Sequence, residues 1–183
     1  MSEDIGLQEL QKRSRKSGIY QKYNNYIIPE HYLTPHGIHG ILHAHRVLFL
    51  ADKISRWYFL TDREKDILGL ACCYHDIGRV NDWGDRRHGE LSCKKIIELK
   101  LLDRIELSSE DKKLILRLIE AHCIEDSAFV GTKREKLLFK ILKDADGLDR
   151  VRLHDLDPTH LRLVISPMLE KLAWRILDIT EDA

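Results

Sequence analysis

The sequence predicts an all-α protein, built as a single helical bundle of about six to eight helices. Apolar residues recur three and four positions apart in segment after segment, which is the spacing of one helix face. Several of these segments begin with residues that cap helices, whereas the alternating pattern of strands is scarce. With 183 residues, 43% of them apolar and 33% charged, the chain is long enough for one core and has the balance of a folded domain.

The N-terminal part, residues 1–35, is predicted to be a helical and irregular segment that packs on a domain formed by residues 36–183. Residues 7–17 have the composition of a short polar helix. Three tyrosines follow at a spacing of three, and they either pack this segment onto the domain or line the rim of a pocket: Tyr20, Tyr23 and Tyr26.

The first main helix is predicted over residues 39–57. One of its faces carries His43, Val47 and Leu50. The next helix begins at the capping box Thr61–Glu64 and ends near Gly78. Its apolar stripe carries Leu68, Cys72 and His75.

A polar loop over 81–87 leads to a helix over 88–99. A further helix is predicted over 110–124, because Ser108 or Ser109 can cap its N-terminus. One face of this helix carries Ile115, Leu118 and His122.

After a break at Gly131, the spacing predicts a helix over 133–145. Its stripe carries Leu137, Ile141 and Asp144. Asp157-Pro158 and Ser166-Pro167 are both typical of a helix start, so two more helices are expected, the last reaching about Ile179.

The apolar stripes of four helices share an unusual feature, because each contains a possible metal ligand: His43, His75, His122 and Asp144. One such histidine alone is more often a hydrogen-bonded core residue than a ligand. Several together are costly to bury unless a partner offsets the desolvation, and a metal ion does so for all of them at once. Metal sites in helical bundles are built from inward side chains of facing helices in this way.

Composition excludes several classes of function. Basic and acidic residues number 30 each, so no net field points to nucleic acid or to an anionic membrane. No apolar stretch is long enough to span a bilayer, and the first ten residues do not resemble a secretory signal. The four cysteines form no C-x-x-C pair, which favours a reduced, cytoplasmic protein with cysteines that act as small buried hydrophobes.

Three strings resemble the HD-domain superfamily. The segment His36–Val47 contains an H-x-x-R-V opening at His43. The segment Cys73–Gly78 contains the His75-Asp76 dipeptide, and Lys143–Arg150 is similar to the closing aspartate segment. The resemblance extends over about residues 36–155, with the motifs in the expected order.

The resemblance implies a set of metal ligands. One divalent ion would be bound by His43, His75, Asp76 and Asp144. His88 and His122 stand where binuclear members carry two further histidines, and Asp76 would then bridge two ions. The mixed nitrogen and oxygen donors suit Mn, Fe, Co, Ni or Zn without choosing among them. Asp146 and Asp149 could orient ligands or could equally pair with Arg150 or Arg152.

The function that the resemblance implies is metal-dependent hydrolysis of a nucleotide or another small phosphate ester. Asp76, Arg79 and Lys140 are the candidate catalytic residues. His39, Arg86 and Arg87 are the candidates for substrate binding, although each basic side chain could equally be a solvated surface group.

Two alternatives remain open. The same six ligands occur in di-iron oxygenases of the superfamily, and degenerate members are noncatalytic signalling or scaffold modules. The string Ile77-Gly78-Arg79 lacks the glutamate that bacterial deoxynucleotidases carry after the His-Asp pair, and the G-Y-P motif of cyclic dinucleotide phosphodiesterases is absent.

Overall fold

A computed structural model describes residues 2–16 and 18–181, and within these ranges the chain is all-helical, as predicted. The α-helices are α1 (Ser2–Arg13), α2 (Ile19–Tyr23), α3 (Ile41–Ser55), α4 (Asp62–Tyr74), α5 (His88–Glu98), α6 (Ser109–Ala121), α7 (Lys133–Leu148) and α8 (Glu170–Glu181). Short 3₁₀ helices connect several of them. None of the described helices is both long and apolar enough to cross a membrane.

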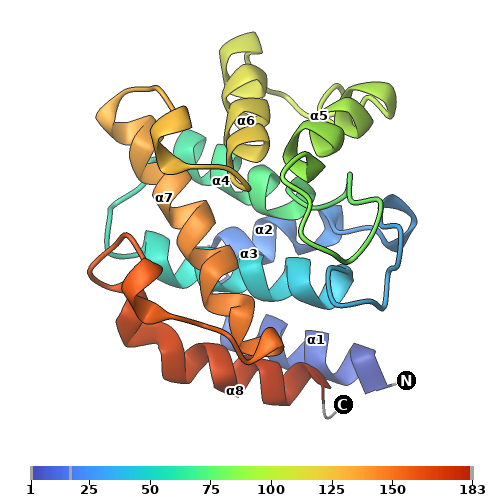
Figure 1. Cartoon of the computed structure of the whole chain (residues 1–183), viewed down its shortest axis with the longest axis vertical. Helices are drawn as coiled ribbons and strands as arrows, with labels where there is room; N and C mark the ends of the chain where they lie inside the picture. The colour runs from blue at the N-terminus through green and yellow to red at the C-terminus, as the bar shows by residue number, and fades with distance from the viewer. Residues whose placement is uncertain (1, 17, 182–183) are drawn as a thin grey trace.

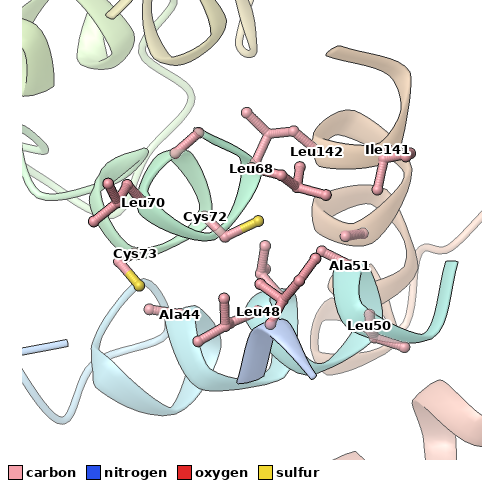
Figure 2. Close-up of a cluster of buried hydrophobic side chains, with 14 of the residues drawn as sticks. Ala44, Leu48, Leu50, Ala51, Leu68, Leu70, Cys72, Cys73, Ile141 and Leu142 are labelled. Carbon is pink, nitrogen blue, oxygen red and sulfur yellow. The ribbon is translucent and has the colours of Figure 1, made fainter. Parts of the chain in front are cut away.

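The bundle is organised around α3, which packs against α4 and α7 (Figure 1). α1 and α8 lie side by side at one end of the molecule, near both termini, and α5 and α6 pack together at the other end. Figure 2 shows Leu48 of α3, Leu68 of α4 and Leu142 of α7 within one apolar cluster. All three side chains are fully buried. The α3–α4–α7 layer is therefore the rigid part on which side chains at the helix ends can be held.

The local start signals of the middle helices are confirmed. Thr61 and Glu64 form the predicted capping box at the N-terminus of α4. The side chain of Ser108 accepts a hydrogen bond from the backbone N–H of Asp111 and so caps α6. Thr132 and Glu135 form a second capping box on α7. These caps satisfy backbone N–H groups that a helix terminus leaves without partners.

Three of the predicted helices differ from the structure in their extent or their cap. The first helix covers Ser2–Arg13 rather than 7–17, and Ser17 lies outside the described residues. Asp157 does cap a helix, but this is a three-residue 3₁₀ turn over Pro158–His160. At the other proline the cap is Ile165 rather than Ser166, and the turn leads directly into α8.

The tyrosines near the N-terminus pack this segment onto the bundle. Tyr20 and Tyr23 are buried, and Tyr20 makes an edge contact with Phe49 of α3 at 5.6 Å between ring centroids. Gly69 of α4 lies so close to the ring of Tyr23 that an added Cβ would be 2.3 Å from it.

Candidate metal centre

The ends of several helices bring ionisable side chains to one place. His43 lies in the first turn of α3, and His75 is the C-terminal cap of α4, directly followed by Asp76. His88 is the first residue of α5, and His122 is the C-terminal cap of α6. These side chains are all buried. Residues far apart in the sequence thus meet where four helices begin or end.

The four imidazoles form two close pairs. Nε2 of His43 lies 3.1 Å from Nε2 of His75, and Nε2 of His88 lies 2.9 Å from Nε2 of His122. Two nitrogens bound to one metal ion at about 2.0–2.1 Å are about 2.9–3.4 Å apart for tetrahedral or octahedral angles. Each pair is therefore spaced as two ligands of one ion.

Asp76 lies between the two pairs. Its Oδ2 is 3.4 Å from Nε2 of His43, and its Oδ1 is 3.3 Å from Nε2 of His88 and 3.6 Å from Nε2 of His122. Oδ1 is buried and has no hydrogen-bond partner. A buried carboxylate oxygen without a hydrogen bond is costly, and a cation shared by both pairs would remove that cost.

The outer nitrogens of the imidazoles determine where their protons lie. Nδ1 of His75 donates to the carbonyl oxygen of Cys72 at 2.8 Å, and Nδ1 of His122 donates to that of Ile119 at 2.6 Å. A carbonyl oxygen only accepts, so the proton of each ring is on Nδ1.

The other two imidazoles are arranged in the same way. Nδ1 of His88 donates to the carbonyl oxygen of Asp85, and Nδ1 of His43 donates to Oδ2 of Asp149 at 2.8 Å. In their neutral forms all four rings therefore turn an unprotonated Nε2 toward the centre. This is the tautomer and orientation of metal-bound histidines, whose second nitrogen is fixed by an outer acceptor.

Electrostatics favour a bound cation over a second proton on His75. Burial lowers the pKa of His75 to about 3, so this ring is neutral near pH 7. Burial acts to raise the pKa of the Asp146 carboxyl, but electrostatic interaction with the nearby imidazoles outweighs burial and holds the pKa at about 2. Asp146 is thus ionised beside a neutral His75 ring, and a bound cation would balance its charge.

On α7, the structure brings Asp146 rather than Asp144 to the histidines. Oδ1 and Oδ2 of Asp144 accept the backbone N–H of Arg162 at 2.9 and 3.0 Å, and Oδ2 accepts that of Leu163 at 2.8 Å. The Arg162 guanidinium adds a contact at 3.4 Å. Asp144 therefore holds the segment before α8 and is not brought to the histidines, whereas Oδ1 of Asp146 lies 3.5 Å from Nε2 of His43.

Sequence reasoning missed Asp146 because it does not lie on the apolar stripe of α7. Asp144 follows Ile141 on the core-facing side and is fully buried, but the side chain of Asp146 keeps 33% of its surface exposed. A ligand at the edge of the core need not share the face of the core residues. The signal that could have found it is the second aspartate of the string Asp144-Ala145-Asp146.

Asp149 fixes the orientation of His43. Its carboxylate accepts the His43 Nδ1–H and also Nε of Arg46 at 2.6 Å. Burial acts to raise the pKa of Asp149, but the Arg46 charge lowers it below its usual range, so the acceptor stays ionised. Arg46 in turn donates to Oγ1 of Thr180 on α8 at 3.0 Å. Asp149 thus both orients a ligand and pairs with Arg46 and Arg152, which lies 3.4 Å away.

The segment around Asp76 is fixed to α5 by Ser92. The Ser92 hydroxyl donates to the carbonyl oxygen of His75 at 2.7 Å and accepts the backbone N–H of Gly78 at 2.9 Å. A Cβ on Gly78 would lie 2.0 Å from the backbone nitrogen of Ser92, so only glycine permits this approach. The position of Asp76 is therefore set by α5 as well as by α4.

The predicted basic residues are divided between the site and the surface. Nε of Arg79 donates to Oδ2 of Asp76 at 2.8 Å, so Arg79 is in the site. His39 stacks edge-on to His43 at 5.8 Å and contacts Asp82 at 3.2 Å, and burial lowers its pKa to about 4. Arg87 pairs with Asp85 at 3.7 Å while its side chain is 77% exposed.

Lys140 is not brought to the histidines. It is exposed on α7, and none of the described hydrogen bonds or ion pairs joins it to the site. Lys143, three residues later, lies nearer, because it borders a cavity of about 950 Å³ that reaches His122. This lysine donates to Oδ1 of Asp126 at 2.7 Å.

The cavity beside His122 is basic along its walls. Its cationic lining residues are Arg86, Lys143, Arg150 and Arg162. Arg150 and Arg162 pair with aspartates, Asp155 and Asp126 respectively. No described hydrogen bond or ion pair involves the guanidinium of Arg86. Another hollow, of about 410 Å³ near Asp52, contains none of the predicted site residues.

A comparison with protein families now tests the resemblance. The family model described as the HD domain matches residues 40–151, which is most of the chain and includes all the histidines and aspartates of the centre. The chain belongs to the HD-domain family. No curated protein and no solved structure matches it.

HD domains bind divalent metals and are typically metal-dependent phosphohydrolases. The His43–His75–Asp76 group and the neighbouring pair of His88 and His122 have the donors that such a metal needs. The family and the geometry therefore agree on a candidate centre for a divalent metal.

Proposed function

We propose that this HD-domain chain is a hydrolase of a small phosphate ester, such as a nucleotide, that uses two divalent ions. The first ion would be held by His43, His75, Asp76 and Asp146. The second would be held by His88 and His122, with Asp76 shared between the two. The observation that carries the proposal is the convergence of four Nε2 atoms, each on a ring whose Nδ1 contacts an outer acceptor, on a buried carboxylate that has an oxygen without a hydrogen bond.

The chemistry that such ions supply when bound is activation of water and polarisation of a phosphoryl oxygen. The chain itself contributes the positions of the donors. Arg79 holds Oδ2 of Asp76 by its Nε–H, and Ser92 fixes the backbone on both sides of that carboxylate. Such fixed donors lower the reorganisation that the reaction requires.

The basic cavity supports an anionic substrate. Arg86 is the cation there whose guanidinium no described acidic side chain neutralises, and the cavity also contains His122 of the centre. A guanidinium donates two parallel hydrogen bonds to phosphate oxygens, which gives both charge balance and orientation. We expect Arg86 to contact the phosphate, whereas Arg87 and Lys140 contribute little.

The test is a screen of phosphomonoesters, nucleotides and cyclic nucleotides with protein loaded with Mn, Co, Ni, Zn or Fe. We expect metal-stimulated release of phosphate or of a nucleotide product, abolished by His75→Ala. His154→Asn is the matched control, because His154 is exposed and has a left-handed backbone conformation that asparagine tolerates. Identical activity of His75→Ala and the parent protein across the panel would refute the proposal.

The same experiment separates the two alternatives. Oxygen consumption by the ferrous protein, with a mixed-valent electron-spin signal and no phosphate release, would support a di-iron oxygenase instead. A protein that binds no metal and is not stabilised by Mn or Ni would support a noncatalytic module.

A further inference from the structure

Cys123 is the residue that follows His122, and it lies beside the pair formed by His88 and His122. Its Sγ and one ring nitrogen each of His88 and His122 all lie within 4.8 Å of one another. Of the two candidate metal-binding clusters among the described residues, this one contains a cysteine, whereas the His43–His75–Asp76 cluster does not. The three donors come from the first residue of α5, from the C-terminal cap of α6 and from the residue after that cap, and α5 and α6 pack against each other.

A second observation points to a ligand at the same place. Asp76 is 3% exposed, and its Oδ1 is the oxygen without a hydrogen-bond partner. It is directed at the same two imidazoles, 3.3 Å from His88 and 3.6 Å from His122. Two imidazoles, one thiol and one carboxylate oxygen therefore lie close together, and the carboxylate oxygen has no hydrogen-bond partner.

The present contacts of the thiol would not prevent coordination. Sγ donates to the carbonyl oxygen of Arg86 at 3.2 Å and has a longer contact of 3.8 Å to that of Glu120. A thiol is a weak donor, so little is lost when these contacts are exchanged for a metal bond. Coordination breaks the S–H bond, its proton goes to solvent, and the sulfur lone pair binds the ion.

We infer that Cys123 is a third ligand of the second ion, together with His88 and His122, and that this site selects a thiophilic divalent ion such as zinc or cobalt. The inference rests on the two-ion centre proposed above. A thiolate favours borderline and soft metals, whereas the first group offers imidazoles and carboxylates only. The two sites of this chain therefore differ in the metals they prefer.

The test is titration of the metal-free protein with cobalt, followed by absorption. We expect a near-ultraviolet sulfur-to-cobalt charge-transfer band in the parent protein and its complete loss in Cys123→Ser. Cys93→Ser is the matched control and should keep the band, because Sγ of Cys93 donates to the carbonyl oxygen of Leu116 and lies outside the cluster. Cobalt binding without the band, or a band unchanged in Cys123→Ser, would overturn the inference.

A second measurement needs no variant and so holds even if Cys123→Ser fails to fold. Iodoacetamide labelling of the parent protein, read by mass spectrometry, should lose its Cys123 product when zinc is bound but keep it with manganese. A cysteine-free peptide of the same digest is the internal reference. Equal labelling of Cys123 with both metals would contradict thiolate coordination.

The outcomes distinguish this inference from the proposed hydrolase. Phosphate-ester hydrolysis without a charge-transfer band would leave the hydrolase standing and remove the sulfur ligand. A band that is lost in Cys123→Ser, in a protein that hydrolyses no phosphate ester, would leave the sulfur ligand standing and remove the hydrolase.

Discussion

Asp144 and Asp146 are two residues apart on α7 but have different roles in the structure. The Asp144 carboxylate accepts backbone N–H groups of Arg162 and Leu163, whereas that of Asp146 faces His43. Asp144 accepts hydrogen bonds from the segment before α8, whereas the Asp146 carboxylate lies beside the His43 imidazole. Exchange of each for asparagine should therefore affect different properties of the protein.

Asp144→Asn should lower the free energy of unfolding of the metal-free protein by about 1–3 kcal/mol, because an ionised acceptor of buried N–H groups is lost. Asp146→Asn should leave that free energy nearly unchanged. Its effect should be on the first metal ion, whose affinity should fall by at least the roughly 10–100-fold that loss of a ligand's hydrogen-bond partner costs. Denaturant unfolding and metal titration measure the two quantities, and the reverse assignment of effects would restore Asp144 as the ligand.

The same pair of residues shows which part of the site the sequence could predict. His43, His75 and His122 lie on or at the ends of apolar stripes, so helical spacing is enough to identify them. Asp146 lies off its stripe, at the edge of the core, where it borders a separate cavity of about 390 Å³. Such a position depends on how α7 is rotated against α3, which spacing within α7 does not contain.

At the scale of elements, the close approach of α5 and α6 sets the distance between His88 and His122. A Cβ on Gly89 would lie 2.6 Å from the carbonyl oxygens of both Ile119 and Glu120. These are backbone atoms, so the helices themselves would have to move apart. The two imidazoles, whose Nε2 atoms are 2.9 Å apart, are carried on the residues next to these contacts.

Gly89→Ala should therefore reduce the bound metal from two ions per chain to one and destabilise the protein by about 1–3 kcal/mol, the usual cost of overpacking. Elemental analysis and denaturant unfolding measure these effects. Gly84→Ala is the control, because nothing lies within 4 Å of a Cβ at that loop position. Two ions retained in Gly89→Ala would mean that the helix spacing does not govern the second site.

A salt bridge joins the N-termini of α4 and α7. The Arg134 guanidinium contacts Oε2 of Glu64 at 2.6 Å. This hydrogen bond, together with those from Thr61, lowers the pKa of Glu64 from 4.5 to about 2 against the effect of burial. A depressed pKa means that the stabilisation is complete above the unfolded-state pKa and is lost as the pH falls toward about 2.

Glu64→Gln should therefore make the protein less sensitive to acid in this range while keeping the helix cap, since glutamine also completes a capping box. The measurement is unfolding by denaturant between about pH 5 and pH 2, the range that the lowered pKa of Glu64 defines. Arg134→Gln should give a slope between those of the parent and Glu64→Gln, because the hydrogen bonds from Thr61 remain. Glu90→Gln, at an exposed pair with Lys94, should leave the slope unchanged because solvent screens it. Equal slopes in all four proteins would remove Glu64 as a source of acid sensitivity.

The fold as a whole was predictable to the extent that its signals are local. Thr61 and Ser108 start α4 and α6 because their side chains bond backbone groups three residues on. Ser166 has the same kind of sequence signal, yet its hydroxyl is buried without a hydrogen-bond partner and Ile165 is the cap. There the packing of the segment against α7 determines where the turn starts. Such packing cannot be predicted from the neighbouring residues in the sequence.

The candidate metal centre is connected to α8 and to the loop that precedes α5. From His43 a chain of contacts runs through Asp149 and Arg46 to Thr180 on α8, and from Asp76 another runs through Arg79 to the 79–87 loop. Without an ion, the centre leaves unprotonated imidazole nitrogens and an unbonded carboxylate oxygen facing one another. We therefore expect the global stability of the folded chain to depend on metal, and not only its activity.

Metal bound at 100 times its dissociation constant stabilises a folded protein by about 2.7 kcal/mol. For a chain of this length each kcal/mol raises Tm by about 2–4 °C, so removal of the ion by a chelator should lower Tm by about 5–10 °C. Asp76→Asn is the control, because it replaces the buried carboxylate, whose Oδ1 has no hydrogen-bond partner, by a neutral amide. Its metal-free form should be at least as stable as the metal-free parent protein. Added metal should change its Tm little. Calorimetry with and without chelator measures both. An equal rise in Tm for the parent and Asp76→Asn would mean that the ion binds elsewhere, because only a centre that includes Asp76 couples metal to folding through this residue.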